Sequence, residues 1–149
     1  FDALVANRFA NRKRRGLYNY IIATIGSLFG YQPIQLKLNG IQKTLFSLSI
    51  ANANQFGNNA FISPYSKIQD GTLEIVAISK LNLWEAAMIS IRLFTKTIGK
   101  SSKVDIQSFQ EMKIECPIGT YLHMDGEALT TSSSTLVVKI VPNCLKVIV

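Results

Sequence analysis

Two apolar segments enclose a long polar loop in the middle of the chain. The first segment, Leu45–Asn52, reads LFSLSIAN, and the second, Thr72–Ile78, reads TLEIVAI. The second half of the loop between them, Ile62–Gly71, reads ISPYSKIQDG. This connection is too long for a tight hairpin turn, and long loops held by a rigid scaffold are more often functional than short ones. We therefore expect two buried strands joined by a functional loop.

The composition is that of a folded domain. Of the 149 residues, 48% are hydrophobic and 17% are charged, which excludes a disordered chain. The net charge of +7 is compatible with nucleic acid, an anionic membrane or a phosphate-bearing ligand as partner. No apolar run reaches the ~18 residues of a membrane span, and no leader pattern is present. We expect a cytoplasmic chain, or one peripheral at the membrane.

The metal-binding residue types are sparse. Cys116 and Cys144 lie in apolar surroundings and are expected to be buried free thiols. His123 is the only histidine, so a Cys/His zinc site is excluded.

Residues 1–30 have the periodicity of two helices, separated near Gly16. A basic cluster, Arg12–Arg15, lies between the two apolar stripes. It is either a solvated helix end or a surface that attracts anionic lipid. Nucleic acid is not expected as a partner, because no recognition-helix pattern and no basic strand with interleaved aromatic residues accompany the cluster.

The next elements are a hairpin and a helix. Strands at Ile34–Leu38 and Gln42–Ile50 flank Asn39-Gly40, the strongest short hairpin signal. A helix begins after Asn82, a good N-cap with Glu85 as its capping-box partner. The helical spacing predicts one buried stripe, made of Leu83, Trp84, Ala87, Met88, Ile91 and Phe94.

The C-terminal part has the pattern of β-structure. Short strands are expected at Val104–Phe109, Met112–Cys116 and Tyr121–Met124, and further strands at Leu136–Val141 and Leu145–Val149. Strands and helices are grouped rather than alternating. The predicted fold class is therefore α+β: a single domain over residues 1–149, mainly an antiparallel β-sandwich-like domain with about three helices.

Two acidic residues stand together at a predicted turn, Asp125-Gly126-Glu127. They are either an ordinary Asp-Gly turn, or two carboxylates that share a metal or act as base and orienting group. Phosphate-binding loops with the usual glycine patterns and the nucleophile-elbow motif are absent from the sequence.

Four motifs in sequence order carry a resemblance to a known family. SPYSKIQDGTLEIV, from Ser63 to Val76, resembles the Pro-x-Ala-x-x-x-Asp-Gly-x-Leu-Asp signature of the diacylglycerol kinase and sphingosine kinase superfamily, in its bacterial soluble lipid-kinase branch. Ile50-Ala51-Asn52 matches its Ala-Asn strand end, and Asp125-Gly126-Glu127 with Pro142 and Leu145 resembles its C-terminal segment. Phe1-Asp2-Ala3 and the segment from Arg12 to Tyr20 are similar to its Gly-Phe-Asp-Ala strand end and the helix that follows.

The resemblance implies the second, β-rich domain of a two-domain lipid kinase. The N-terminal nucleotide-binding domain, with its Gly-Gly-Asp-Gly-Thr loop, is expected to be absent from this chain, so that ATP would be bound mainly elsewhere and the chain alone would be inactive. The implied reaction transfers the γ-phosphate of ATP to the hydroxyl of a diacylglycerol- or sphingosine-type lipid, in lipid metabolism or phospholipid biosynthesis.

The resemblance also implies roles for individual residues. Glu127 would be the general base, with Asp125 as its partner in the cleft. Mg²⁺ would be held by the Asp70 carboxylate and the main-chain carbonyls of Lys67 and Thr72, since Mg²⁺ prefers oxygen ligands. Gln69 stands where the family often has a second acid.

Two rival functions remain open. The chain could be a non-catalytic lipid- or membrane-binding β module that has kept the fold, or a structural domain whose basic helix binds nucleic acid. Arg12–Arg15 would serve an anionic membrane surface in the first case. A homodimer is compatible with each of these functions.

Overall fold

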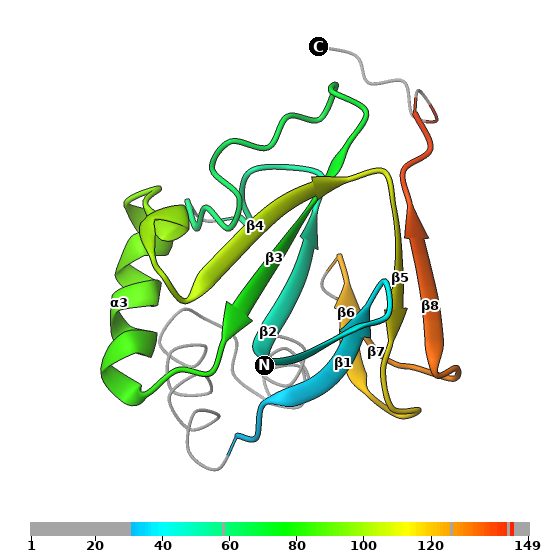
Figure 1. Cartoon of the computed structure of the whole chain (residues 1–149). Coiled ribbons are helices and arrows are strands. Elements are labelled where there is room, and N and C mark those ends of the chain that lie inside the picture. The colour runs from blue at the N-terminus through cyan, green and yellow to red at the C-terminus, as the bar shows by residue number, and fades with distance from the viewer. Residues whose placement is uncertain (1–30, 58, 126, 143, 145–149) are drawn as a thin grey trace.

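The computed structural model describes residues 31–57, 59–125, 127–142 and 144. In these ranges the fold is mostly antiparallel β-structure with one α-helix. Figure 1 shows the arrangement of these elements. The strands are β1 (Ile34–Leu38), β2 (Ile41–Ala51), β3 (Leu73–Ser79), β4 (Val104–Phe109), β5 (Glu111–Glu115), β6 (Tyr121–Met124), β7 (Glu127–Thr130) and β8 (Thr135–Lys139). The helices are α3 (Leu83–Phe94) and the short 3₁₀ helix η1 (Ile98–Lys100).

Six strands form one antiparallel sheet in the order β4-β3-β2-β1-β5-β8, and β6 pairs with β7 in a separate hairpin. The turn between β1 and β2 fixes the register of this sheet. Leu38 pairs with Ile41, and Asn39 and Gly40 both have positive φ, at 47° and 84°. Type I′ turns require this geometry at both central positions. The predicted Asn-Gly hairpin is therefore confirmed.

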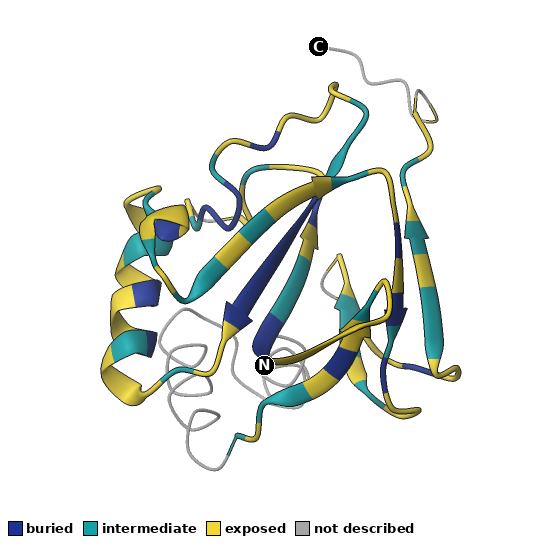
Figure 2. Cartoon of the chain, in the orientation of Figure 1, coloured by how far each residue is buried: buried dark blue, intermediate teal, exposed yellow. Residues whose placement is uncertain are grey.

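Strand β3 lies between β2 and β4 and is buried on both of its faces (Figure 2). Successive side chains of a strand point to opposite faces, so Val76 and Ile78 lie on one side of the sheet and Ile75 and Ala77 on the other. The first side packs against α3 and the loop before β3, in a cluster made of Phe46, Ala51, Ile62, Val76, Ile78, Ile89 and Ile98.

The sheet curls so that β5 approaches the second side of β3. Ala77 shares a cluster with Leu36 and Cys116, and Ile75 shares one with Met112 and Ile114. Strands β3 and β5 are not neighbours in the sheet, so these clusters require two β layers facing each other. The fold is therefore β-sandwich-like, as predicted.

The β1–β2 turn also holds β5 in place. The Lys113 N–H donates to the Asn39 side-chain oxygen at 2.9 Å, and the Asn39 N–H donates to the Lys113 carbonyl at 2.9 Å. Only two residue pairs join β1 to β5 in register, so these bonds extend a short pairing and anchor one β layer to the other.

Helix α3 begins as predicted but packs on a different face. Asn82 caps it, and the reciprocal bonds between Asn82 and Glu85, both 2.8 Å, form a capping box. The buried residues of the helix are Ala86 and Ile89, and Ile89 packs in the core cluster with half-buried Leu93 against it. The predicted buried stripe, including Trp84 and Met88, is wrong: its large residues are exposed. Helical spacing identified an apolar stripe, but small Ala86 lets the helix approach the sheet on its other side.

Three further expectations can be compared with the structure. One α-helix is found in the described ranges, in place of about three, and the two helices predicted in residues 1–30 lie outside those ranges, as does the strand predicted at residues 145–149. Cys116 is a buried free thiol as expected, whereas Cys144 is free and exposed. None of the described helices is long and apolar enough to cross a membrane.

Burial of β3 makes its apolar residues the most sensitive to truncation. Ile78→Ala should lower the free energy of unfolding by about 2–5 kcal/mol, because Ile78 is 6% exposed and belongs to the core cluster. Ile41→Ala, at a residue that is 64% exposed, is the matched control and should cost less than about 0.5 kcal/mol. Urea unfolding of both variants measures the difference, and equal losses would contradict the prediction.

Acid should weaken the start of α3. The hydrogen bond from the Asn82 N–H lowers the pKa of Glu85, and Lys103, 3.3 Å away, adds to this effect. The folded state therefore binds fewer protons than the unfolded state near the ordinary glutamate pKa of about 4.3. This stabilisation is present above that pH and is lost as the pH falls through the lowered pKa.

Glu85→Gln should accordingly flatten the acid side of the stability–pH profile, measured by thermal unfolding between about pH 6 and about pH 3. Glu111→Gln is the control, since Glu111 is exposed and forms no ion pair with another described residue. An unchanged profile in Glu85→Gln would show that the capping box does not depend on the charge.

Candidate functional site

The loop between β2 and β3 is fixed to the core at its middle. Phe61, Ile62 and Ser63 are buried, and the Phe61 N–H donates to the Leu93 carbonyl of α3 at 2.8 Å. The Ser63 N–H donates to the Asn54 carbonyl at 3.2 Å, which closes the first half of the loop on itself. The loop therefore presents its second half, where the predicted metal ligands lie, from a fixed base.

Asp70 and Thr72 form a tight turn at the end of this loop. The Thr72 N–H and the Thr72 hydroxyl both donate to Asp70 Oδ1, each at 3.0 Å. Gly71 has φ of 72°, a conformation that favours glycine. Asp70 is exposed. Because both bonds use Oδ1, the second carboxylate oxygen of Asp70 remains free for another ligand.

An open concavity of about 510 Å³ lies beside the turn. It is lined by residues from the two halves of the loop: Ala53, Asn54, Ser66, Lys67, Ile68, Gln69 and Asp70. Two of the three predicted metal ligands, Lys67 and Asp70, lie on it, and Thr72 is bonded to Asp70.

The donor chemistry of this turn fits Mg²⁺. Among the described residues, neither the Lys67 nor the Thr72 carbonyl accepts a turn or loop hydrogen bond. One carboxylate with two carbonyl oxygens, completed by water, is a donor set that Mg²⁺ accepts. Groups of three or more His, Cys, Asp or Glu side chains do not occur in the described ranges, so protein ligands alone would not complete the coordination. This ligand set stays a prediction.

The second predicted pair lies at the tip of the β6–β7 hairpin. Met124 pairs with Glu127 across a two-residue turn, and Asp125 has φ of 48°, as in a type I′ turn. Asp125 and Glu127 are both exposed. Neither forms an ion pair with another described residue. Both carboxylates are therefore exposed at the hairpin tip, and their shared role stays a prediction.

The base of the hairpin is held more tightly than its tip. Thr131 is buried, and its hydroxyl donates to the Pro117 carbonyl at 3.1 Å and accepts from the Thr120 N–H at 3.1 Å. The Thr131 N–H donates to the Thr120 carbonyl at 3.0 Å. The tip therefore projects from a fixed point.

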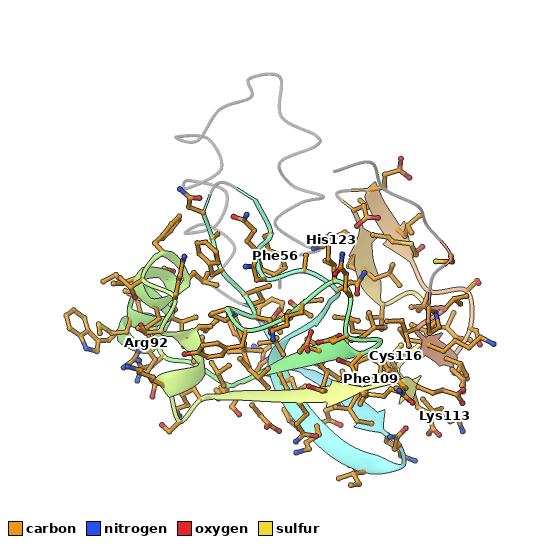
Figure 3. All side chains as sticks on the ribbon, turned by 90° about the horizontal axis from the view of Figure 1, so that it is seen from above. Phe56, Arg92, Phe109, Lys113, Cys116 and His123 are labelled. Carbon is orange, nitrogen blue, oxygen red and sulfur yellow. The ribbon has the colours of Figure 1, made fainter. Side chains whose placement is uncertain are left out.

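His123 and Phe56 show how the hairpin lies relative to the loop. Seen from above, His123 of β6 and Phe56 of the loop lie on the same side of β2 and β3 (Figure 3). His123 is half-buried, and its Nδ1 is buried without a hydrogen-bond partner among the described residues. The two predicted sets lie on separate elements, the β2–β3 loop and the β6–β7 hairpin, and their joint action in one site stays a prediction.

Glu74, at the start of β3, is a buried acidic residue that sequence reasoning did not single out. It is 6% exposed, its Oε1 accepts a long 3.5 Å bond from the Ser108 hydroxyl, and its Oε2 is buried with no hydrogen-bond partner in the described ranges. A buried carboxylate is costly unless it is paired, protonated or bound to a cation. The sequence signal was present: Glu74 is the one charged residue of an otherwise apolar strand.

Comparison with known proteins assigns the fold of the chain. Residues 1–149 match the family described as the YegS C-terminal NAD kinase beta sandwich-like domain. No curated protein matches the chain.

Two solved structures from Bacillus anthracis str. Sterne, both of candidate diacylglycerol kinases, are similar to the chain. The first has a TM-score of 0.54 at 18% identity and the match covers 87% of this chain and 46% of that chain. The second has a TM-score of 0.50 at 20% identity, with 89% and 46% covered. The chain thus spans less than half the length of either structure. At these identities the likeness establishes the fold alone.

Magnesium binding at the Asp70 turn can be tested by isosteric substitution. Asp70→Asn keeps the oxygen that accepts both Thr72 bonds and removes the charge that would hold the ion. Saturating Mg²⁺ should raise the thermal unfolding temperature of the wild type, by about 2.7 kcal/mol of stability at one hundred times Kd, and should not raise that of the variant.

NaCl at equal ionic strength controls for screening, and Asp105→Asn, at an exposed aspartate of β4, controls for the loss of one charge. An equal rise in the wild type and in Asp70→Asn would remove Asp70 from the ligand set.

Proposed function

Since the chain belongs to the family of the YegS C-terminal NAD kinase beta sandwich-like domain, we propose that it forms the lipid-site part of an ATP-dependent lipid kinase. The observation that carries this proposal is the family match over residues 1–149, which agrees with the order of motifs along the sequence. The names of the two similar structures, both candidate diacylglycerol kinases, give further support.

The proposed reaction transfers the γ-phosphoryl group of ATP to the hydroxyl of a diacylglycerol- or sphingosine-type lipid. Phosphoryl transfer depends on positioning and on stabilisation of charge more than on covalent chemistry. ATP would be held mainly by a nucleotide-binding domain outside this chain. The chain would contribute the base that activates the lipid hydroxyl and the surface on which the lipid lies.

Glu127 is the proposed general base. An exposed carboxylate at a projecting hairpin tip can approach a bound lipid hydroxyl, accept its proton as the new O–P bond forms, and release it to water after ADP leaves. Asp125, one residue before Gly126 at the same tip, would act beside it. Mg²⁺ at the Asp70 turn would, when bound, add positive charge and fix the loop.

One observation favours the rival function, a non-catalytic lipid- or membrane-binding β module. A general base is normally held in place by a hydrogen bond from a neighbouring group. Neither Glu127 nor Asp125 has such a partner among the described residues. The rival needs no oriented base, and would use the same fold only to bind lipid.

Lipid phosphorylation by the natural protein that carries this chain separates these functions. Transfer of labelled phosphate from ATP to a panel of diacylglycerol- and sphingosine-type lipids, with Mg²⁺ present, should be detectable in the wild type. Glu127→Gln should lower kcat by about two to four orders of magnitude. Glu111→Gln, an exposed glutamate of β5, is the control and should keep full activity.

The outcomes are distinct. Equal activity of Glu127→Gln and wild type would leave the kinase function in place and overturn the role of Glu127. No transfer to any lipid would overturn the kinase function in favour of the binding module. The 149-residue chain by itself should show no transfer, because the nucleotide site lies elsewhere in the proposal.

A further inference from the structure

The outward face of α3 is apolar. We use this name for five side chains that share one side of the helix: Leu83, Trp84, Met88, Ile91 and Phe94. Trp84 is 76% exposed, Phe94 59% and Ile91 55%. At 100° per residue these five positions span a sector of about 140°, and the buried residues Ala86 and Ile89 lie outside it.

A helix of this kind needs a second apolar environment. A surface helix ordinarily has one apolar face against the core and a polar face toward water. In helix α3, Ala86 and Ile89 are buried and Ile89 belongs to the core cluster, yet five large apolar residues of the helix are exposed. Figure 2 shows the buried and exposed positions of the helix. Contiguous exposed apolar patches of this kind mark interaction sites.

The charges around this face are almost all positive. From Lys80 to Lys103 the sequence has five basic residues, Lys80, Arg92, Lys96, Lys100 and Lys103, and one acidic residue, Glu85, which gives a net charge of +4. Glu85 is paired with Lys103 at 3.3 Å and with the Asn82 N–H. Lys80, Lys96 and Lys100 are exposed. None of these three lysines forms an ion pair with another described residue, and the Lys96 Nζ lies 4.2 Å from the centre of the Phe61 ring. Lys80 and Lys96 flank α3 in the sequence, so we call these lysines the basic rim of the face.

This charge decides between the possible occupants. A second copy of the chain would bring +4 against +4 in a two-fold contact, and like charges across an interface are unfavourable. An anionic lipid surface complements the rim, while its acyl region accepts the apolar face. Trp84 also suits a bilayer surface, since an indole ring places an apolar body in the lipid and its N–H near the headgroups. We propose that the outward face of α3 docks the protein onto an anionic lipid bilayer.

The proposal deepens the proposed function, because a kinase acting on a lipid must reach it in a membrane. Its test is independent of catalysis. Vesicle binding needs neither ATP nor Glu127, so a failure of lipid phosphorylation and a failure of docking can be told apart.

Trp84 makes the docking directly observable, since it is the only tryptophan of the chain. Vesicles of phosphatidylcholine with phosphatidylglycerol should shift its emission to shorter wavelength, and brominated acyl chains in those vesicles should quench it. Phosphatidylcholine vesicles alone should bind at least about tenfold more weakly. If the protein binds but the Trp84 emission is not quenched, the proposal is overturned, because another surface, such as Arg12–Arg15, then binds the vesicle. No binding to anionic vesicles would overturn it as well.

Variants of the face keep Trp84 as the reporter. Ile91→Ala with Phe94→Ala should weaken vesicle partitioning by at least about tenfold. The matched control is Ile41→Ala with Val137→Ala, since these residues of β2 and β8 are 64% and 59% exposed. It should bind like the wild type. Lys96→Gln and Lys100→Gln should each weaken binding to anionic vesicles about fivefold. Thermal unfolding confirms that each variant folds.

Equal partitioning of the face variant and its control would overturn the proposal. Sedimentation of the chain without lipid tests the other occupant. A dimer that shifts the Trp84 emission and is lost in the Ile91→Ala, Phe94→Ala variant would assign the face to a second copy instead.

Discussion

The burial of β3 on both faces is the constraint on which the rest of this structure depends. A strand with apolar side chains on both sides cannot face water on either, so two different layers must cover it. Helix α3 covers the side of Val76 and Ile78. The curled β1–β5 part of the sheet covers the side of Ile75 and Ala77. Each layer is then fixed by a local device, the capping box at Asn82 and the bond pair between Asn39 and Lys113.

The same constraint places the functional loop. Strands β2 and β3 are antiparallel neighbours, so the loop that joins them must emerge at one end of the most buried strand. Phe61 and Ile62 bind that loop into the α3 side of the core. The Asp70 turn and the half-paired Glu74 then lie at the start of β3, on the most rigid element available. A site that depends on the position of a few oxygen atoms is best supported in this way.

The sequence indicated most of the strands and little of their mutual arrangement. Local apolar patterns located β1 through β5, and Asn39-Gly40 predicted the turn between β1 and β2. Asp125-Gly126 likewise predicted a turn, but strand β7 after it was not predicted. However, local patterns do not contain the pairing of β1 with β5 or the separation of β6 and β7 from the main sheet, since these depend on contacts between distant segments. The position of the hairpin relative to the Asp70 turn was unpredictable for the same reason.

Two features that local patterns did not predict are the exposed apolar face of α3 and the burial of Glu74. The periodicity of α3 identified an apolar stripe but assigned it to the core, because stability alone would place large side chains inside. Glu74 was not singled out, because the local pattern does not show that its side chain is buried and acidic residues are rarely buried. In each case the structure departs from what stability favours, with apolar surface in solvent and a carboxylate in the core. Such departures are expected mainly at functional sites, and for the outward face of α3 the occupant that we propose is a lipid surface.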